Sequence, residues 1–296
     1  MSESGSLINI DLGGFGKAAN TLVEKVSNAI GEVYRPRLIV REAEANAKAR
    51  LIEARCVNEV SDIQSRAITR LVHQEERKQR NYESIVKKTI EILPDEAQPE
   101  NIDDDWVSYF FERCSSVSDI DIQFIWANLL SGESQNSGFY SKRTIDFISM
   151  MSKQEAKKLT ELSQFFIQVH NSEYLFVDDI NKNSFHGTSL KYVDFIHMES
   201  IGLISIGLGF NAIDLPKEFS IKYHNHTIDM DLPAANETID TRYTLEIGSV
   251  VLTPLGEEVI TLCKTESNEM FFTSLLSKLT KDGLVKTTPY DMFENC

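Results

Sequence analysis

The first stretch whose residue types could do chemistry is glycine-rich and lies near the start of the chain. An extended segment, Leu7 to Leu12, leads into the run Gly13 to Lys17. Glycine-rich turns that open a helix can hold a phosphate on converging backbone amides, as in the pattern G-x-x-x-x-G-K-[ST]. Here Leu12 stands near the place of the first glycine, and Ala18 follows Lys17, so the hydroxyl that would bind magnesium is missing. The spacing predicts a tight entry into a helix and not a nucleotide site.

Histidines form the second group that could do chemistry. His224 and His226 are two residues apart, and His186, His197 and the pair Asp178 to Asp179 lie upstream. A zinc site needs about four nitrogen, sulfur or oxygen ligands that converge. The first two histidines fall in a predicted turn and the other spacings are irregular, so we expect no metal site. Nucleophile–base patterns and paired carboxylates in a defined motif are also missing from the sequence. We therefore predict no catalytic residue and no cofactor.

The composition is ordinary for a soluble protein, since 42% of the 296 residues are hydrophobic and 25% are charged. No stretch approaches the about 18 consecutive apolar residues of a transmembrane helix. The N-terminus lacks the basic and then apolar regions of a secretory signal. The four cysteines are scattered, as is typical of free thiols in a reducing compartment: Cys56, Cys114, Cys263 and Cys296. We expect a cytoplasmic protein that is large enough for two domains.

Charge is unevenly distributed along the chain. The stretch Arg35 to Ile92 carries 13 Lys and Arg against 9 Asp and Glu, whereas the rest from Leu93 carries 15 against 32. The acidic part would repel a phosphate backbone. Contact with nucleic acid would therefore have to use the long helix around Arg77, Lys78, Arg80 and the pair Lys87 to Lys88, or a local patch.

The chain is organised around a long helical stretch from Pro36 to Leu93. Proline suits the first position of a helix, and Pro94 ends the stretch because proline cannot continue one. No Gly or Pro lies between them, and apolar residues recur at steps of three and four, which predicts an amphipathic, coiled-coil-like helix. The octet Gln74 to Asn81 has no apolar face, so it could be a solvated helical bridge, a bend or a break. The first apolar run consists of Leu51, Ala54, Val57, Val60, Ile63, Ala67 and Leu71.

An apolar stripe of this length must be covered by the rest of the chain or by a second copy. We expect self-association through the long helix, with Val57 and Val60 in the contact. A shorter amphipathic helix, Lys17 to Val33, precedes it and is expected to pack on another helix.

The rest of the chain predicts a mainly α fold with a C-terminal α+β part. We expect the stalk in residues 1–93, a linker in 94–105, a helical bundle in 106–171 and an α+β domain in 172–296. In the bundle, Asp105 and Ser118 are expected to cap helices, Ser152 and Glu155 to begin a helix that reaches Val169, and Ser131 to Glu133 to end another. The aromatic residues Phe110, Phe111 and Trp126 are expected in its core.

The C-terminal domain has the element order of a winged-helix module. A helix, Leu190 to Ser200, precedes short strands, and the segments Phe219 to Tyr223 and Thr227 to Met230 predict a hairpin. Thr253 and Pro254 are typical of a helix start. Recognition helices of DNA-binding versions are basic, whereas here Lys191 is the one Lys or Arg of the candidate helix. We therefore expect this winged-helix-like unit to contact protein.

Several short blocks in the chain have distinctive sequence: Ile10 to Gly14, Ile102 to Trp106, Phe111 to Cys114, Trp126 to Glu133, Ser141 to Thr144 and Ile247 to Gly256. Together they resemble a bacterial family of unknown function that is similar in this region to the abortive-infection alpha-type proteins. The resemblance carries no catalytic residues to this chain. It implies a bacterial cytoplasmic protein connected with phage defence.

Charged residues in these blocks are candidate interaction sites. Glu133, near the end of its predicted helix, could form a buried or interfacial ion pair with Arg143. Asp104 is a further candidate, although it could simply cap a helix together with Asp105. Our prediction is a non-enzymatic, homo-oligomeric interaction or assembly protein that acts as a sensor or effector in phage defence. The alternative is a DNA-binding regulator that uses the winged-helix-like domain or the basic part of the long helix.

Overall fold

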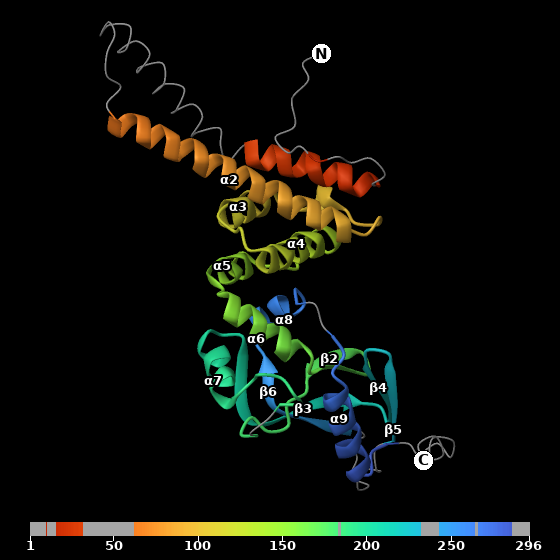
Figure 1. The fold of residues 1–296 in the computed structure, drawn as a ribbon. Coiled ribbons are helices and arrows are strands. Elements are labelled where there is room, and N and C mark those ends of the chain that lie inside the picture. Colours follow the sequence, from red (N-terminus) through yellow and green to blue (C-terminus); the bar gives the residue numbers. More distant parts are fainter. Residues whose placement is uncertain are drawn as a thin grey trace, which may run out of the picture. The chain divides into compact units, whose positions relative to one another are not determined.

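The computed structural model describes residues 10, 16–31, 62–182, 185–231, 243–263 and 266–285. The chain divides into two compact units, Met1–Lys153 and Gln154–Cys296. The described part of the first unit is helical, and the second unit combines helices with two antiparallel sheets (Figure 1). The predicted mixture of α and α+β parts is therefore observed. The domain limits drawn at residues 93, 105 and 171 stay predictions.

The first unit is a set of packed helices. A helix at residues 17–31 precedes α2 (Asp62–Ile92), η1 (Pro99–Asn101), α3 (Asp104–Cys114), α4 (Ile120–Gln135) and α5 (Lys142–Met150). The polar octet is helical throughout, so the part of the long helix that the structure describes is continuous across it. The predicted aromatic core is confirmed, because Phe110, Phe111 and Trp126 are at most 1% exposed and the Phe110 ring lies 5.0 Å from the other two ring centroids.

Two helix caps differ from those predicted. Asp103, not Asp105, caps α3, because its extended backbone lets a carboxylate oxygen accept from the Trp106 amide at 2.8 Å. Asp119, not Ser118, caps α4 by accepting from the amides of residues 121 and 122. Runs of neighbouring Asp and Ser offer several capping oxygens, and backbone geometry selects one of them. α4 also continues to Gln135, past the end predicted at Ser131 to Glu133.

The second unit contains a four-stranded and a two-stranded sheet. Strands β1 (Phe166–Val169), β2 (Ser172–Leu175), β4 (Glu218–Tyr223) and β5 (His226–Asp231) form a sheet in the order β2-β1-β4-β5, and β3 (Ile204–Leu215) pairs with β6 (Tyr243–Leu252). The helices are α6 (Lys153–Ser163), α7 (Tyr192–Ser200), α8 (Pro254–Ile260) and α9 (Glu269–Lys281). The predicted hairpin is confirmed as β4–β5. The prediction of a helix reaching Val169 was wrong, since α6 ends at Ser163 and β1 follows.

The start of α8 explains one predicted motif. Thr253 accepts a hydrogen bond from the Gly256 amide at 3.1 Å and donates one to the Gly202 carbonyl at 2.5 Å, so it caps α8 and ties it to the segment before β3. A Cβ atom at Gly256 would overlap the carbonyl oxygen of Leu203, which makes glycine necessary there. The Leu-Thr-Pro-Leu-Gly sequence therefore fixes the junction between β6, β3 and α8.

Candidate interaction sites

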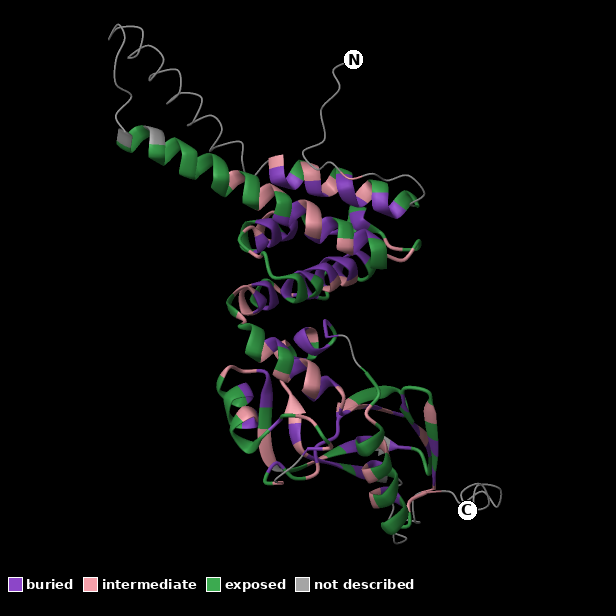
Figure 2. Ribbon diagram, in the orientation of Figure 1, coloured by how far each residue is buried: buried purple, intermediate pink, exposed green. Residues whose placement is uncertain are grey.

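The N-terminal half of α2 exposes large apolar side chains. The exposed fractions are 70% for Ile63, 53% for Ile68, 39% for Leu71 and 49% for Val72. Figure 2 shows the change along the helix, from exposed residues in its first half to buried ones in its second half. Large apolar residues scattered singly on a surface are normal, but several on one helix form a patch that can bind a partner.

The exposed and buried residues of α2 lie on the same face of the helix. A helix of 3.6 residues per turn returns to the same angle after five turns, which is an offset of 18 residues. Four residues with exposed side chains, Ala67, Ile68, Leu71 and Val72, form the exposed patch. They correspond in this way to four fully or nearly fully buried residues: Ala67 to Ile85, Ile68 to Val86, Leu71 to Thr89 and Val72 to Ile90. One apolar stripe therefore runs along the described part of α2, exposed in its first half and buried against other described helices in its second half.

Contacts from the neighbouring helices show how the second half is covered. Asn81 donates to the carbonyl of Ser115 after α3 at 3.0 Å, and Ser84 donates to Gln123 of α4 at 2.7 Å. The side chain of Thr89 is fully buried beside α4. Helices α3 and α4 thus pack against this face of α2, and polar contacts form at the edges of the apolar stripe.

A row of arginines lies on another side of the exposed half of α2. Arg66, Arg70 and Arg77 follow each other at steps of four and seven residues, which places them on one side of the helix, about 150° around the helix axis from the centre of the patch. Of the predicted basic residues, Arg77 is exposed, Lys78 pairs with Glu75 at 3.0 Å, and Arg80 donates to a backbone carbonyl of its own helix at 3.3 Å. The predicted contact residues Val57 and Val60 lie outside the described residues.

The candidate Asp104 connects two helices of the first unit. Its carboxylate lies 2.6 Å from the ammonium group of Lys25, which projects from the helix at residues 17–31. Lys25 is 17% exposed and Asp104 is 76% exposed, so solvent weakens this pair. The position of Asp104 is consistent with a structural contact, and its role as a partner-binding residue stays a prediction.

The candidate Glu133 organises a loop. Its side chain is 1% exposed, and its two carboxylate oxygens accept from the amides of Gly138 at 2.6 Å and Tyr140 at 3.0 Å. Trp106 holds the same loop by donating from Nε1 to the Tyr140 carbonyl at 2.8 Å. A Cβ atom at Gly132 would overlap the Tyr140 ring. The Ser-Gly-Glu sequence therefore stabilises the fold of the α4–α5 loop. Arg143 lies exposed on α5.

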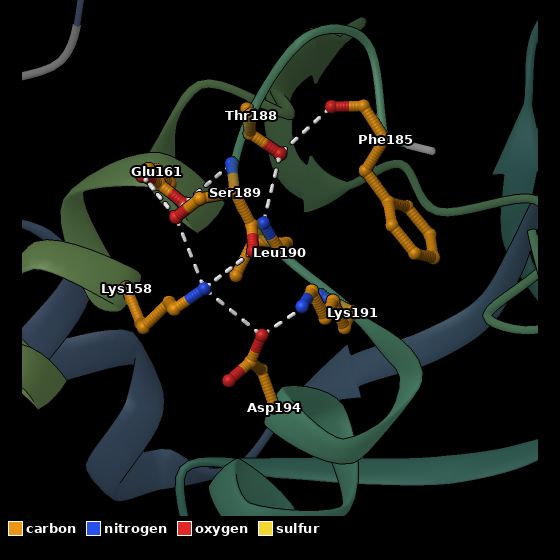
Figure 3. Close-up of polar contacts among 8 residues, drawn as sticks. All are labelled: Lys158, Glu161, Phe185, Thr188, Ser189, Leu190, Lys191 and Asp194. Atoms are coloured by element: carbon orange, nitrogen blue, oxygen red, sulfur yellow. Dashed lines mark hydrogen bonds and ion pairs between the residues drawn. The ribbon is translucent and has the colours of Figure 1, made fainter. Parts of the chain in front are cut away.

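A polar ladder positions α7 in the second unit (Figure 3). Glu161 of α6 accepts from the amide and the hydroxyl of Ser189, and Lys158 forms an ion pair with Asp194 at 3.0 Å. One turn earlier on α6, Glu155 lies 2.8 Å from His197. These contacts at steps of three residues fix α7 against α6. The sequence alone singled out Glu155 and His197, for other roles, but not Lys158, Glu161, Ser189 or Asp194.

The outer face of α7 is apolar, not basic. Tyr192 is 46% exposed, Val193 65% and Ile196 40%. Recognition of a DNA groove relies on cationic side chains, and this face lacks them. The structure places α7 before β3 as predicted, but the winged-helix assignment stays a prediction.

Metal-binding and thiol chemistry receive no support from the described part of the chain. No group of three or more His, Cys, Asp or Glu residues there is arranged to hold a metal ion. Burial raises the pKa of the Cys263 thiol to about 12 and that of Cys114 well above its usual value, so both thiols stay protonated. Among the described helices, none is both long and apolar enough to cross a membrane.

Comparison with known proteins identifies a family. A model described as "Protein of unknown function (DUF2806)" matches residues 65–276. The chain belongs to this DUF2806 family. The match begins within the exposed half of α2 and continues into α9, so it includes both the apolar patch and the polar ladder. No curated protein and no solved structure matches the chain. Nothing in these comparisons links the DUF2806 chain to abortive-infection proteins.

Proposed function

We propose that this chain is a non-enzymatic assembly protein that binds a second copy of itself through the exposed half of α2. The observation that carries the proposal is the five-turn repeat along α2. The patch of Ala67, Ile68, Leu71 and Val72 lies on the same face of α2 as the residues 18 positions later, which α3 and α4 cover. In the second half of α2, apolar residues on this face pack against other helices of the same chain. The exposed first half is therefore suited to packing against a helix of another chain.

Charge favours a second copy as the occupant. The stretch Arg35 to Ile92, which contains α2, carries 13 Lys and Arg against 9 Asp and Glu, whereas the stretch from Leu93 onward carries 15 against 32. A second copy therefore brings both an apolar stripe for the patch and an acidic surface that the basic stretch attracts. Contact by the same patch on both copies would form a closed, two-fold symmetric dimer. Coiled-coil pairing is the form of contact that the three- and four-residue spacing favours.

Solution mass measured by light scattering over a concentration range tests the proposal. We compare the natural chain with Leu71→Glu and with the control Leu276→Glu on α9, because Leu71 and Leu276 are 39% and 36% exposed. Because Leu71 is 39% exposed, losing the surface that the second copy would bury costs about 1–2 kcal/mol in total, which raises the dissociation constant about tenfold, and the desolvation of two Glu carboxylates in the contact raises it further.

We expect a dimer for the natural chain and for Leu276→Glu, and a monomer for Leu71→Glu. A natural chain that stays monomeric at every concentration would overturn the proposal. So would a dimer that tolerates Leu71→Glu, since that dimer would use a different surface.

The arginine row also keeps DNA binding as a second candidate function. If α2 binds DNA, affinity should fall steeply with salt, and charge reversal at Arg77, Lys78 and Arg80 should abolish it. The net charge of −15 opposes this candidate. A sensor or effector role in phage defence rests on the sequence resemblance alone and stays a prediction.

A further inference from the structure

The second unit contains a cavity of about 300 Å³ that none of the preceding sites uses. Its walls come from β1, β2, the end of β4 and the C-terminal end of α8. Phe166 and Ile260 supply apolar surface, while Gln168, Glu173 and Lys222 supply polar groups. A concave site with apolar walls and a few polar groups is the usual form of a small-molecule site, and this volume lies near the lower end of the common range.

Three of the polar residues form one row across the sheet. Gln168 of β1 is paired with Glu173 of β2 on one side and with Lys222 of β4 on the other. Directly paired residues project to the same face of a sheet, so all three point to the side of the cavity. Neighbouring strands are about 4.8 Å apart, which separates the two ends of the row by about 10 Å. The row therefore presents a carboxylate, an amide and an ammonium group in that order.

A second basic group lies at the ammonium end. His224 follows Lys222 by two residues and also lines the cavity. The carboxylate end has no such cationic neighbour among the described residues of the wall, which are Ser163, Phe166, Ile167, Gln168, Glu173, Lys222, His224, Ile260, Thr261 and Cys263. The cavity thus has opposite charges at its two ends and a hydrogen-bonding amide between them.

We propose that this cavity binds a short peptide as a zwitterion, with its terminal ammonium at Glu173, a peptide group at Gln168 and its terminal carboxylate at Lys222 and His224. Three residues of extended chain span about 10 Å, which matches the row. The apolar walls accommodate small side chains between the charged ends. A polyphosphate fits the cavity poorly because Glu173 would repel it.

The cavity is a binding site and not a reaction site. Cys263 in its wall is protonated, since burial raises the pKa of its thiol to about 12. Peptide binding is therefore expected to leave the peptide unchanged.

Calorimetric titration of the full-length chain with trialanine tests the proposal. The matched ligands are N-acetyl-trialanine and trialanine amide, each of which lacks one terminal charge. The matched variants are Glu173→Gln and Lys222→Gln, with Lys281→Gln on α9 as a control outside the cavity. Each charged contact is expected to contribute about two- to fivefold in affinity, because Glu173 and Lys222 are exposed and solvent weakens their ion pairs.

The expected pattern is specific for each end. Acetylation should weaken binding to the natural chain about two- to fivefold but leave binding to Glu173→Gln unchanged. Amidation should likewise weaken binding to the natural chain but leave binding to Lys222→Gln unchanged. The absence of binding to the natural chain at millimolar trialanine would overturn the proposal. Binding that ignores both variants would do the same, because the peptide would then lie elsewhere. The Leu71→Glu monomer should bind trialanine normally, which keeps this test independent of self-association.

Discussion

Replacing Glu133 with Gln tests how the α4–α5 loop is held in the first unit. The carboxylate is 1% exposed and uses one oxygen for the Gly138 amide at 2.6 Å and the other for the Tyr140 amide at 3.0 Å. Glutamine keeps the size and one accepting oxygen, but its amide nitrogen can only donate. One of the two backbone amides would therefore face another donor in a buried place.

The expected loss follows from these two contacts. A hydrogen bond to a charged group contributes about 1.5–3 kcal/mol, and leaving a buried donor without an acceptor costs about 1–3 kcal/mol. We expect Glu133→Gln to lower the free energy of unfolding by about 2–4 kcal/mol. For a unit of this size this corresponds to a Tm decrease of about 4–16 °C. Thermal unfolding followed by calorimetry measures the change.

A control separates the loop contacts from a general effect of removing a carboxylate. Glu91 is exposed on α2, and Glu91→Gln should shift the Tm by no more than about 1–2 °C. Equal Tm values for Glu133→Gln and the natural chain would refute the reasoning, because the two amides would then need no ionised partner.

Three further predictions concern buried or half-buried side chains of the two units. Trp106→Phe should cost about 1–3 kcal/mol more than Trp126→Phe, because the Trp106 indole donates to a buried carbonyl at 2.8 Å whereas Nε1 of Trp126 has no partner among the described residues; urea unfolding compares them. Burial, aided by nearby Lys182, lowers the pKa of His186, so the unfolded chain binds the proton more tightly and stability should fall as the pH drops below about 6.5. Asparagine tolerates the left-handed backbone of His186, so His186→Asn should fold, and its free energy of unfolding should change less with pH between about pH 5 and 7 than that of the natural chain. Asp194→Asn should destabilise the second unit by about 1–2 kcal/mol through loss of its ion pair with α6, and proteolysis near α7 should become faster.

Local sequence predicted the elements whose stabilising contacts are themselves local. The hairpin β4–β5 follows from alternating apolar residues around a short turn, and the start of α8 follows from Thr253 and Pro254. The helical stretch across the octet could not be decided from the sequence, because the octet has no apolar face. In the structure Asn81 is 5% exposed and binds the carbonyl of Ser115, a contact between residues distant in sequence.

Strand β1 shows why the remaining predictions failed. Apolar residues at positions 159, 162, 165, 166 and 169 fit a helical period, so the sequence favours one helix to Val169. The chain instead forms a strand because Val169 pairs with Ile221 of β4, which is distant in sequence. The role of Glu133 was hidden for a similar reason, since its partners are backbone amides that converge only after the loop has folded. Helix α9 was not predicted.

Hydrogen exchange along α2, measured at a low and at a hundredfold higher protein concentration, tests self-association most directly. The account predicts that amides in the exposed half, at residues 63–78, exchange more slowly at the higher concentration, because the second copy adds stability only where it binds. Amides at residues 82–90, which α3 and α4 already cover, should exchange at the same rate at both concentrations. Equal exchange of residues 63–78 at both concentrations, in samples whose light scattering shows a dimer at the higher one, would contradict the account, since the dimer would then form through another surface.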